Sequence, residues 1–200
     1  MKSAKRDLEY GGYSVELAQS PESVVSDIIN RNNEICDFWS NSRGWAPNEA
    51  AELLAKSRLD WQVSLSHCLR LWLKPTADEN IEGRLILAWT NLGALAEGTM
   101  KFFLSVHERD YSQMPVTRGR NGTPRDLDAL QFEELRQFYK KKVWTESQRK
   151  WDDWLTEIQK RRNAIHAYRN REIGTFDDFF RNLGEYFDFL DELEGQVPYP

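Results

Sequence analysis

The residues whose types best suit chemistry are gathered in one short segment near the C-terminal end of the chain. Two arginines, a histidine and a tyrosine follow one another within eight residues, at Arg161, Arg162, His166 and Tyr168. A histidine titrates near neutral pH, so it can take or give a proton as a general base or acid. An arginine stays charged and can hold phosphate oxygens as negative charge grows on them. Together these residue types suit acid–base chemistry at a phosphate group.

The segment must be positioned by a helix, which the sequence predicts over residues 146–171. Apolar residues at helical spacing predict its buried stripe, at Trp151, Ile158 and Ile165. Arg162 and His166 are four residues apart and share one flank of that stripe. Arg161 and His166 are five apart, so an ideal helix separates them by about 140°. A single helix therefore cannot bring Arg161 and His166 together directly.

The pattern Arg161-x4-His166-x-Tyr168 resembles the R-x4-H-x-Y signature of HEPN domains, most closely the HEPN toxins paired with MNT nucleotidyltransferase antitoxins. The resemblance covers eight residues of the chain and implies a helical bundle that forms a homodimer, in which two copies of the Arg and His share one cleft. It implies a metal-independent endoribonuclease, a toxin or defence effector, that needs no cofactor. Such enzymes cleave RNA to leave a 2′,3′-cyclic phosphate and a 5′-hydroxyl. RNA, a second copy of the chain and an MNT-type antitoxin are the implied partners.

The resemblance also assigns roles to individual residues. His166 corresponds to the general acid/base, Arg161 to the phosphate clamp, and Tyr168 to the tyrosine to which the antitoxin adds AMP. Family members often carry Asn, Asp or His directly after the motif arginine, whereas this sequence has Arg162. Either Arg162 acts as a second cation, or Arg162 and Asn163 form the functional pair at a shortened spacing. The neighbouring residues expected to bind substrate are Lys160, Asn163 and Arg169.

Charge is distributed unevenly along the chain. The net charge of −5 argues against a protein that binds nucleic acid over its whole surface. Residues 136–171 nevertheless hold eleven Lys and Arg against four Asp and Glu, a net charge of +7. Residues 172–194 hold eight acids and one arginine, a net charge of −7. This pattern fits a basic face for RNA, or equally two solvated helix faces that partly neutralise each other.

The elements around the motif predict an all-α fold, a single-domain up-down bundle of about six helices, HEPN-like, over residues 20–200. A loose N-terminal arm is expected at residues 1–19, because Gly11-Gly12 close that stretch. Pro, Gly and capping residues bound the predicted helices, over residues 20–44, 47–75, 78–110, 128–143, 146–171 and from 175 onward. Residues 111–124 read as a loop, and no strand is expected.

Composition excludes several other classes of protein. No apolar run is long enough for a membrane span, and the N-terminal residues lack the apolar region of a secretory signal. Cys36 and Cys68 have no metal-type or disulfide-type spacing, so we expect no metal site and a reducing, cytoplasmic location. The alternative to a ribonuclease is a non-catalytic HEPN-like helical module that binds RNA or a partner protein. A plain helical scaffold with an accidental motif is the third hypothesis.

Overall fold

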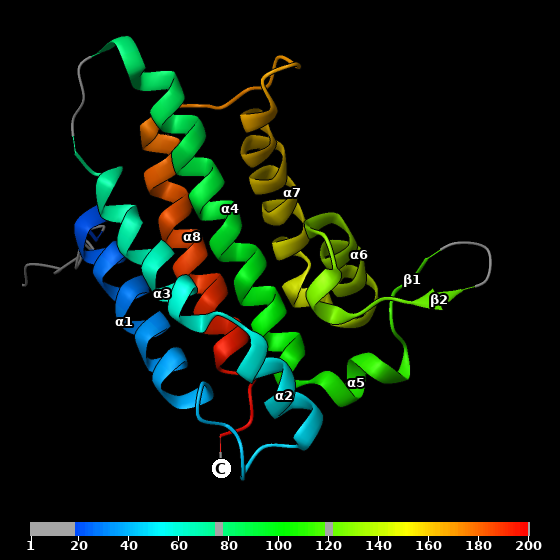
Figure 1. The fold of residues 1–200 in the computed structure, drawn as a ribbon. Helices are drawn as coiled ribbons and strands as arrows, with labels where there is room; N and C mark the ends of the chain where they lie inside the picture. The colour runs from blue at the N-terminus through cyan, green and yellow to red at the C-terminus, as the bar shows by residue number, and fades with distance from the viewer. Residues whose placement is uncertain (1–18, 75–77, 119–121, 200) are drawn as a thin grey trace, which may run out of the picture.

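Helices make up nearly all the regular structure in the computed structural model, which describes residues 19–74, 78–118 and 122–199 (Figure 1). Eight α-helices lie in these residues: α1 (Pro21–Trp39), α2 (Asn48–Lys56), α3 (Leu59–Cys68), α4 (Ile81–Val106), α5 (Glu108–Gln113), α6 (Phe132–Lys142), α7 (Lys150–Arg162) and α8 (Phe176–Glu194). Short 3-10 turns occur at Leu69–Leu71, Asp78–Asn80, Leu127–Ala129, Glu146–Gln148 and Asn163–His166. The all-α prediction is confirmed. The predicted N-terminal arm lies outside the described residues, except for Gln19.

The helices form an up-down bundle with α4 at its centre. Along the chain, α1, α3, α4, α7 and α8 alternate in direction, and α4 lies between α3 and α8 on one side and α6 and α7 on the other (Figure 1). No described helix has both the length and the apolar character needed to cross a lipid bilayer.

The core of this bundle is rich in aromatic side chains. The largest fully buried side chains are Trp39, Trp89, Trp151, Tyr139, Tyr186, Phe179 and Phe189. Buried Tyr139 and Tyr186 hydrogen-bond through their hydroxyls, to the Met100 carbonyl at 2.7 Å and the Thr99 hydroxyl at 3.0 Å. Large rings bury much apolar surface per residue, so they anchor the helices against one another.

Two helix starts are set by side-chain caps in the way the sequence predicts. The Ser20 hydroxyl accepts a hydrogen bond from the Ser23 backbone N–H at 3.2 Å, with Pro21 in the first turn of α1. At α8, Thr175 and Asp178 form a reciprocal capping box.

Two long predicted helices are each broken in the structure, which explains why eight helices are present instead of six. The helix expected over residues 47–75 stops at Ser57, whose backbone is extended and whose hydroxyl donates to the Leu54 carbonyl at 2.6 Å. Such a bond to the preceding turn competes with helix continuation. The helix expected over residues 78–110 is interrupted at His107, where the backbone leaves helical geometry between α4 and α5.

The expected loop over residues 111–124 contains a small hairpin, so the prediction that no strand is present was wrong. Strands β1 (Thr117–Arg118) and β2 (Thr123–Pro124) pair antiparallel, with Thr117 opposite Pro124. Two residues per strand are too few to show a period of two in the sequence.

Candidate functional site

The motif segment leaves the helix earlier than predicted. Helix α7 ends at Arg162, one 3-10 turn follows to His166, and Ala167 has a left-handed backbone with φ of 52°. The helix predicted to reach residue 171 is therefore too long. Because a 3-10 turn advances the chain by about 120° per residue, side chains after Arg162 rotate away from the predicted stripe. Ile165, expected to be buried, is 44% exposed.

The side chain of Arg161 contacts an acidic and an aromatic neighbour. Its Nη2 lies 2.7 Å from Glu157 Oε1, and its guanidinium carbon lies 4.5 Å from the centroid of the Trp89 ring. Only 15% of the side chain is exposed. Its Nη1 is buried without a hydrogen-bond partner. Arg161 therefore packs as a half-buried cation over an indole, an arrangement that stabilises both groups.

The segment between α7 and α8 is fixed by the same neighbours. The Trp89 indole N–H donates to the Ile173 carbonyl at 2.8 Å. Gly174 has φ of 66°, and a Cβ there would lie 3.1 Å from Arg161 Nη1 and 2.8 Å from Asp178 Oδ2. Glycine is thus required at this position both by its backbone angle and by the close approach of Arg161.

Asp178 carries a charge that complements Arg161. Hydrogen bonds from the backbone and hydroxyl of Thr175 lower the pKa of Asp178. The ion pair with Arg181, at 3.1 Å, and the positive charge of Arg161 lower it further. The carboxylate therefore lies ionised at the N-terminal end of α8, where it also favours the helix dipole.

Arg162 points to a different helix from Arg161. Its Nη1 lies 2.7 Å from Glu97 Oε2, and its guanidinium carbon lies 5.3 Å from the Phe132 ring centroid. The stem of the side chain packs on Gly93, where an added Cβ would lie 2.7 Å from Arg162 Cδ. Arg162 consequently joins α7 to α4, and the two arginines face different surroundings.

His166 and Tyr168 lie on the surface. His166 is exposed, and its imidazole makes no hydrogen bond or ion pair with any described side chain. Tyr168 is fully exposed, and its backbone N–H donates to the His166 carbonyl at 2.7 Å. Within one chain, therefore, neither arginine contacts His166. For Arg161 this agrees with the separation expected from the helix. Arg162 was expected on the same flank as His166, but α7 ends at Arg162 and its side chain points to Glu97 of α4.

A groove of about 720 Å³ opens beside Arg161. It is lined by the basic and amide side chains of Lys160, Arg161, Asn170 and Arg171, and by Thr156, Asp153, Glu157 and Glu172. The sequence pointed to Lys160 and Arg161 but missed Asn170 and Arg171. The chain reversal at Ala167 returns these two residues alongside α7, and no helical-wheel argument reveals it.

The remaining predicted substrate-binding residues are not part of this groove. Asn163 is half-buried and Arg169 is exposed, and neither side chain has a hydrogen-bond partner among the described residues. Of the three predicted substrate-binding residues, only Lys160 lines the groove with Arg161.

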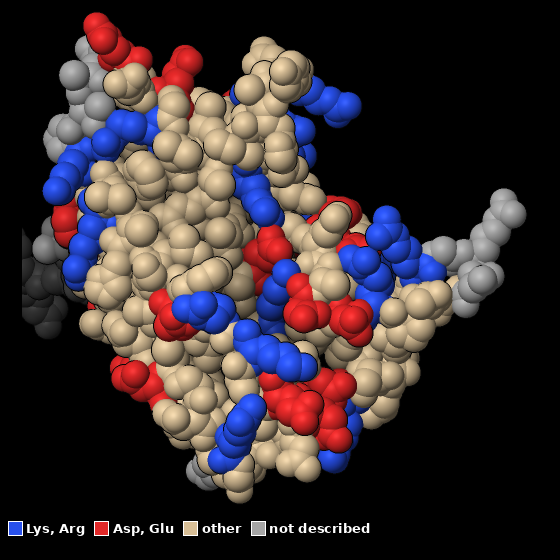
Figure 2. All heavy atoms as spheres, in the orientation of Figure 1, with Lys and Arg blue, Asp and Glu red and all other residues tan. Residues whose placement is uncertain are grey.

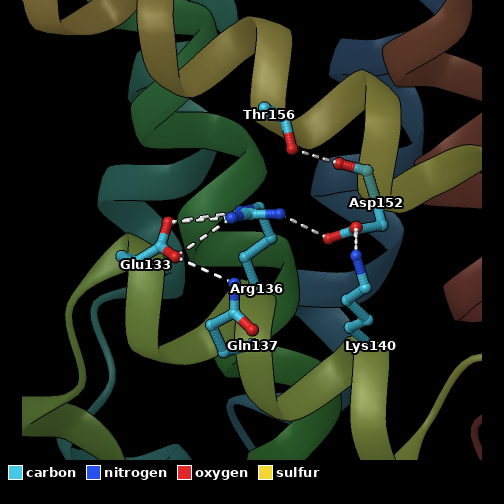
Figure 3. A network of polar contacts seen from close by, with 6 residues as sticks. All are labelled: Glu133, Arg136, Gln137, Lys140, Asp152 and Thr156. Atoms are coloured by element: carbon cyan, nitrogen blue, oxygen red, sulfur yellow. Dashed lines mark hydrogen bonds and ion pairs between the residues drawn. The ribbon is translucent and has the colours of Figure 1, made fainter.

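An ion-pair network around buried Asp152 supports the start of α7 (Figure 3). Asp152, whose side chain is 7% exposed, accepts from Arg136 Nη1 and Lys140 Nζ of α6, each at 2.7 Å. Burial alone would raise the pKa of Asp152, but hydrogen bonds from Lys140 and Arg136 outweigh it and hold the pKa below its ordinary value. Part of the basic stretch therefore serves to join α6 to α7.

The acidic stretch after residue 171 is also partly neutralised within the fold. Arg31 of α1 pairs with Asp191 at 2.8 Å and with Glu194 at 2.6 Å. These acids of α8 therefore pair with α1, and no ion pair among the described residues joins α8 to the basic stretch by direct contact.

No group of three or more His, Cys, Asp or Glu side chains in the described parts of the chain is arranged to hold a metal ion. A scan of protein-family models and searches of curated proteins and of solved structures found no match to this chain.

Proposed function

We propose that this protein is a metal-independent endoribonuclease of HEPN type, active in the cytoplasm as a homodimer. The observation that carries the proposal is an exposed histidine without side-chain partners, His166, on the turn that follows α7, whose basic side chains Lys160 and Arg161 line an open groove. In the proposed reaction the RNA 2′-hydroxyl attacks the adjacent phosphorus and the bond to the 5′-oxygen breaks. His166 takes the hydroxyl proton or gives one to the departing oxygen, leaving a 2′,3′-cyclic phosphate and a 5′-hydroxyl.

The groove beside Arg161 supports contacts to the RNA backbone. Lys160 and Arg171 line it, and neither has a carboxylate partner among the described residues. Arg161 also reaches the groove, whereas Arg162 is held against α4 by Glu97. Arg161 is therefore the better candidate for the clamp, and a phosphate there must replace the carboxylate of Glu157.

An uncharged surface supports the association of two copies. Residues 85–96 of α4 include no charged side chain, and Leu87 is 47% exposed. The turn that carries exposed Ile165 contacts the same helix. Figure 2 shows a largely uncharged area over the upper part of α4, with charged side chains gathered below it. A second copy covering this area would bury exposed apolar side chains and bring its own His166 near the first.

Tyr168 supports the proposal of an MNT-type partner. Its side chain is fully exposed, so a nucleotidyltransferase has free access to the hydroxyl for AMP transfer. Such a modification would add a phosphate two residues from His166 and oppose RNA binding by charge repulsion.

A second candidate function rests on the pairing of both arginines. Because Arg161 and Arg162 already have carboxylate partners at 2.7 Å, they suit a structural role equally well. The chain would then be a non-catalytic helical module that binds RNA or a partner protein through Lys160, Arg169 and Arg171.

The two functions differ in how activity depends on association. We expect RNA cleavage in EDTA, with specific activity that falls on dilution as dimers dissociate. Leu87→Asp places a charge in the uncharged face and is expected to lower both the dimer fraction and the cleavage rate, because a buried unpaired charge opposes association. Arg70→Asp, at an exposed position on the turn after α3, serves as the control. Salt-sensitive RNA binding without cleavage at any concentration would support the non-catalytic module.

A further inference from the structure

Two adjoining cavities lie on the surface of the bundle away from the motif. The inner pocket, of about 210 Å³, lies where α2 and α3 meet α4, and its apolar walls come from Leu53, Leu59, Phe102 and Leu127. The outer groove, of about 530 Å³, lies between α2, α5 and the segment that follows β2. Leu53 and Leu127 line both cavities, so the two form one composite groove. The inner pocket is also lined by Arg58 and Lys101, whose charges are paired with Asp60 and Glu97.

The outer groove has an excess of negative charge. Five carboxylates line it, from Glu49, Glu52, Glu108, Asp126 and Asp128, and none has a side-chain hydrogen bond or ion pair among the described residues. The two cations in the lining are Lys56 and Arg125, which leaves a net charge of −3. Figure 2 shows acidic side chains gathered over α2 and α5 on this face. Because like charges repel, these carboxylates favour a cationic ligand.

Of the two cations in the outer groove, Arg125 already has partners within the chain. Its Nη2 donates to the Ala129 carbonyl at 2.6 Å and lies 3.3 Å from Glu134 Oε2. Lys56 remains where the two cavities meet and offsets one of the carboxylates.

The walls of the composite groove are held by contacts within the chain. The hydroxyl of buried Tyr111 donates to the Arg125 carbonyl at 2.7 Å. Lys101 Nζ donates to the Asp128 carbonyl at 3.2 Å, and Leu127 is 4% exposed. These contacts fix the segment after β2 against α4 and α5. A ligand therefore meets a formed site and avoids part of the ordering cost of binding.

We propose that this composite groove binds a short basic segment of a partner protein. One bulky apolar side chain of that segment occupies the inner pocket, and flanking Lys or Arg side chains lie against the carboxylates of the outer groove. The apolar walls favour such a peptide over a simple polycation, because a polycation has no group that gains from contact with Leu53, Leu59 and Phe102. The site is independent of His166 and of the proposed cleavage of RNA.

The test is a titration of the full-length protein into a fluorescein-labelled peptide in which one leucine is flanked on each side by Lys-Arg. We expect saturable binding that weakens by about fivefold or more when serine replaces the leucine, or when the protein carries both Glu49→Gln and Glu52→Gln. Both glutamates are exposed on α2, so the variant is expected to keep its fold. Glu185→Gln, at an exposed carboxylate on α8, is expected to bind as the wild type does.

Three outcomes overturn the proposal. The first is an absence of saturable binding. The second is equal affinity for the leucine and serine peptides, or displacement of the leucine peptide by spermine as effectively as by the same peptide without its label. Either result would identify a general polycation surface. The third is unchanged binding by the Glu49→Gln, Glu52→Gln variant.

Discussion

The guanidinium of Arg161 lies over the indole of Trp89, 4.5 Å from the ring centroid. The indole N–H of Trp89 in turn donates to the Ile173 carbonyl at 2.8 Å. One arginine of the motif thus helps to hold the segment that leads from the motif turn to α8. A loss of activity on changing Arg161 has two explanations, a lost phosphate contact or a displaced segment, and stability measurements separate them.

Arg161→Ala is expected to lower the free energy of unfolding by about 1–2 kcal/mol, because it removes the stacking on Trp89 and leaves Glu157 without its cation. Urea denaturation measures the change. Hydrogen exchange of residues 167–174 should also become faster. Arg171 lines the same groove without an ion pair, so Arg171→Ala is the control. Its free energy of unfolding is expected to lie within about 0.5 kcal/mol of that of the wild type. Equal stability of Arg161→Ala and Arg171→Ala would contradict the structural role given to Arg161.

Gly93→Ala is expected to destabilise the fold although alanine favours helices. Its Cβ would lie 2.7 Å from Arg162 Cδ and 2.9 Å from Arg162 Cβ, so α7 must move away from α4. Overpacking of this kind costs about 1–3 kcal/mol, more than the gain of about 1 kcal/mol in helix propensity. Gly83→Ala, also on α4, meets no atom within 4 Å and should instead raise the melting temperature. A melting temperature for Gly93→Ala at or above that of Gly83→Ala would show that the helices are not in close contact there.

Asp152→Asn tests the network between α6 and α7. The substitution is expected to lower the free energy of unfolding by about 1–3 kcal/mol at pH 7, because Arg136 and Lys140 lose the carboxylate that both contact. The pKa of folded Asp152 lies below the ordinary value, so this stabilisation is complete above the unfolded pKa of about 3.9 and is lost as the pH falls through the folded pKa. Urea midpoints of the two proteins should therefore differ at pH 7 and converge below about pH 4. A constant difference across this range would show that Asp152 contributes by a route other than its charge.

The sequence predicts those parts of the fold that depend on local chemistry. Ser20 and Thr175 start α1 and α8 as expected, because their hydroxyls satisfy backbone N–H groups only three residues away. The breaks at Ser57 and His107 are harder to predict, because residues on both sides continue the apolar pattern of a helix. There the side chains still pack into the core while the backbone changes course.

The backbone of the candidate site is also hard to predict from the sequence. Alanine seldom adopts a positive φ, so nothing at Ala167 itself predicts a chain reversal. The reversal is supported from α4, by the bond from Trp89 to the Ile173 carbonyl, eighty-four residues along the chain. The types and order of the motif residues were therefore available from the sequence. The placement of Asn170 and Arg171 beside Lys160 depends on tertiary contacts.

The most direct test of the central claim is RNA cleavage by the wild type and by His166→Gln, in excess EDTA and with the ends of the products analysed. His166 is exposed and makes no side-chain contact within the described residues, so His166→Gln should fold with unchanged stability. We expect the wild type to leave 2′,3′-cyclic phosphate and 5′-hydroxyl ends, and His166→Gln to be slower by a factor of about 10² or more. Equal cleavage by the two proteins, or no cleavage by a wild type shown to be dimeric, would contradict the assignment of His166 as the catalytic acid/base.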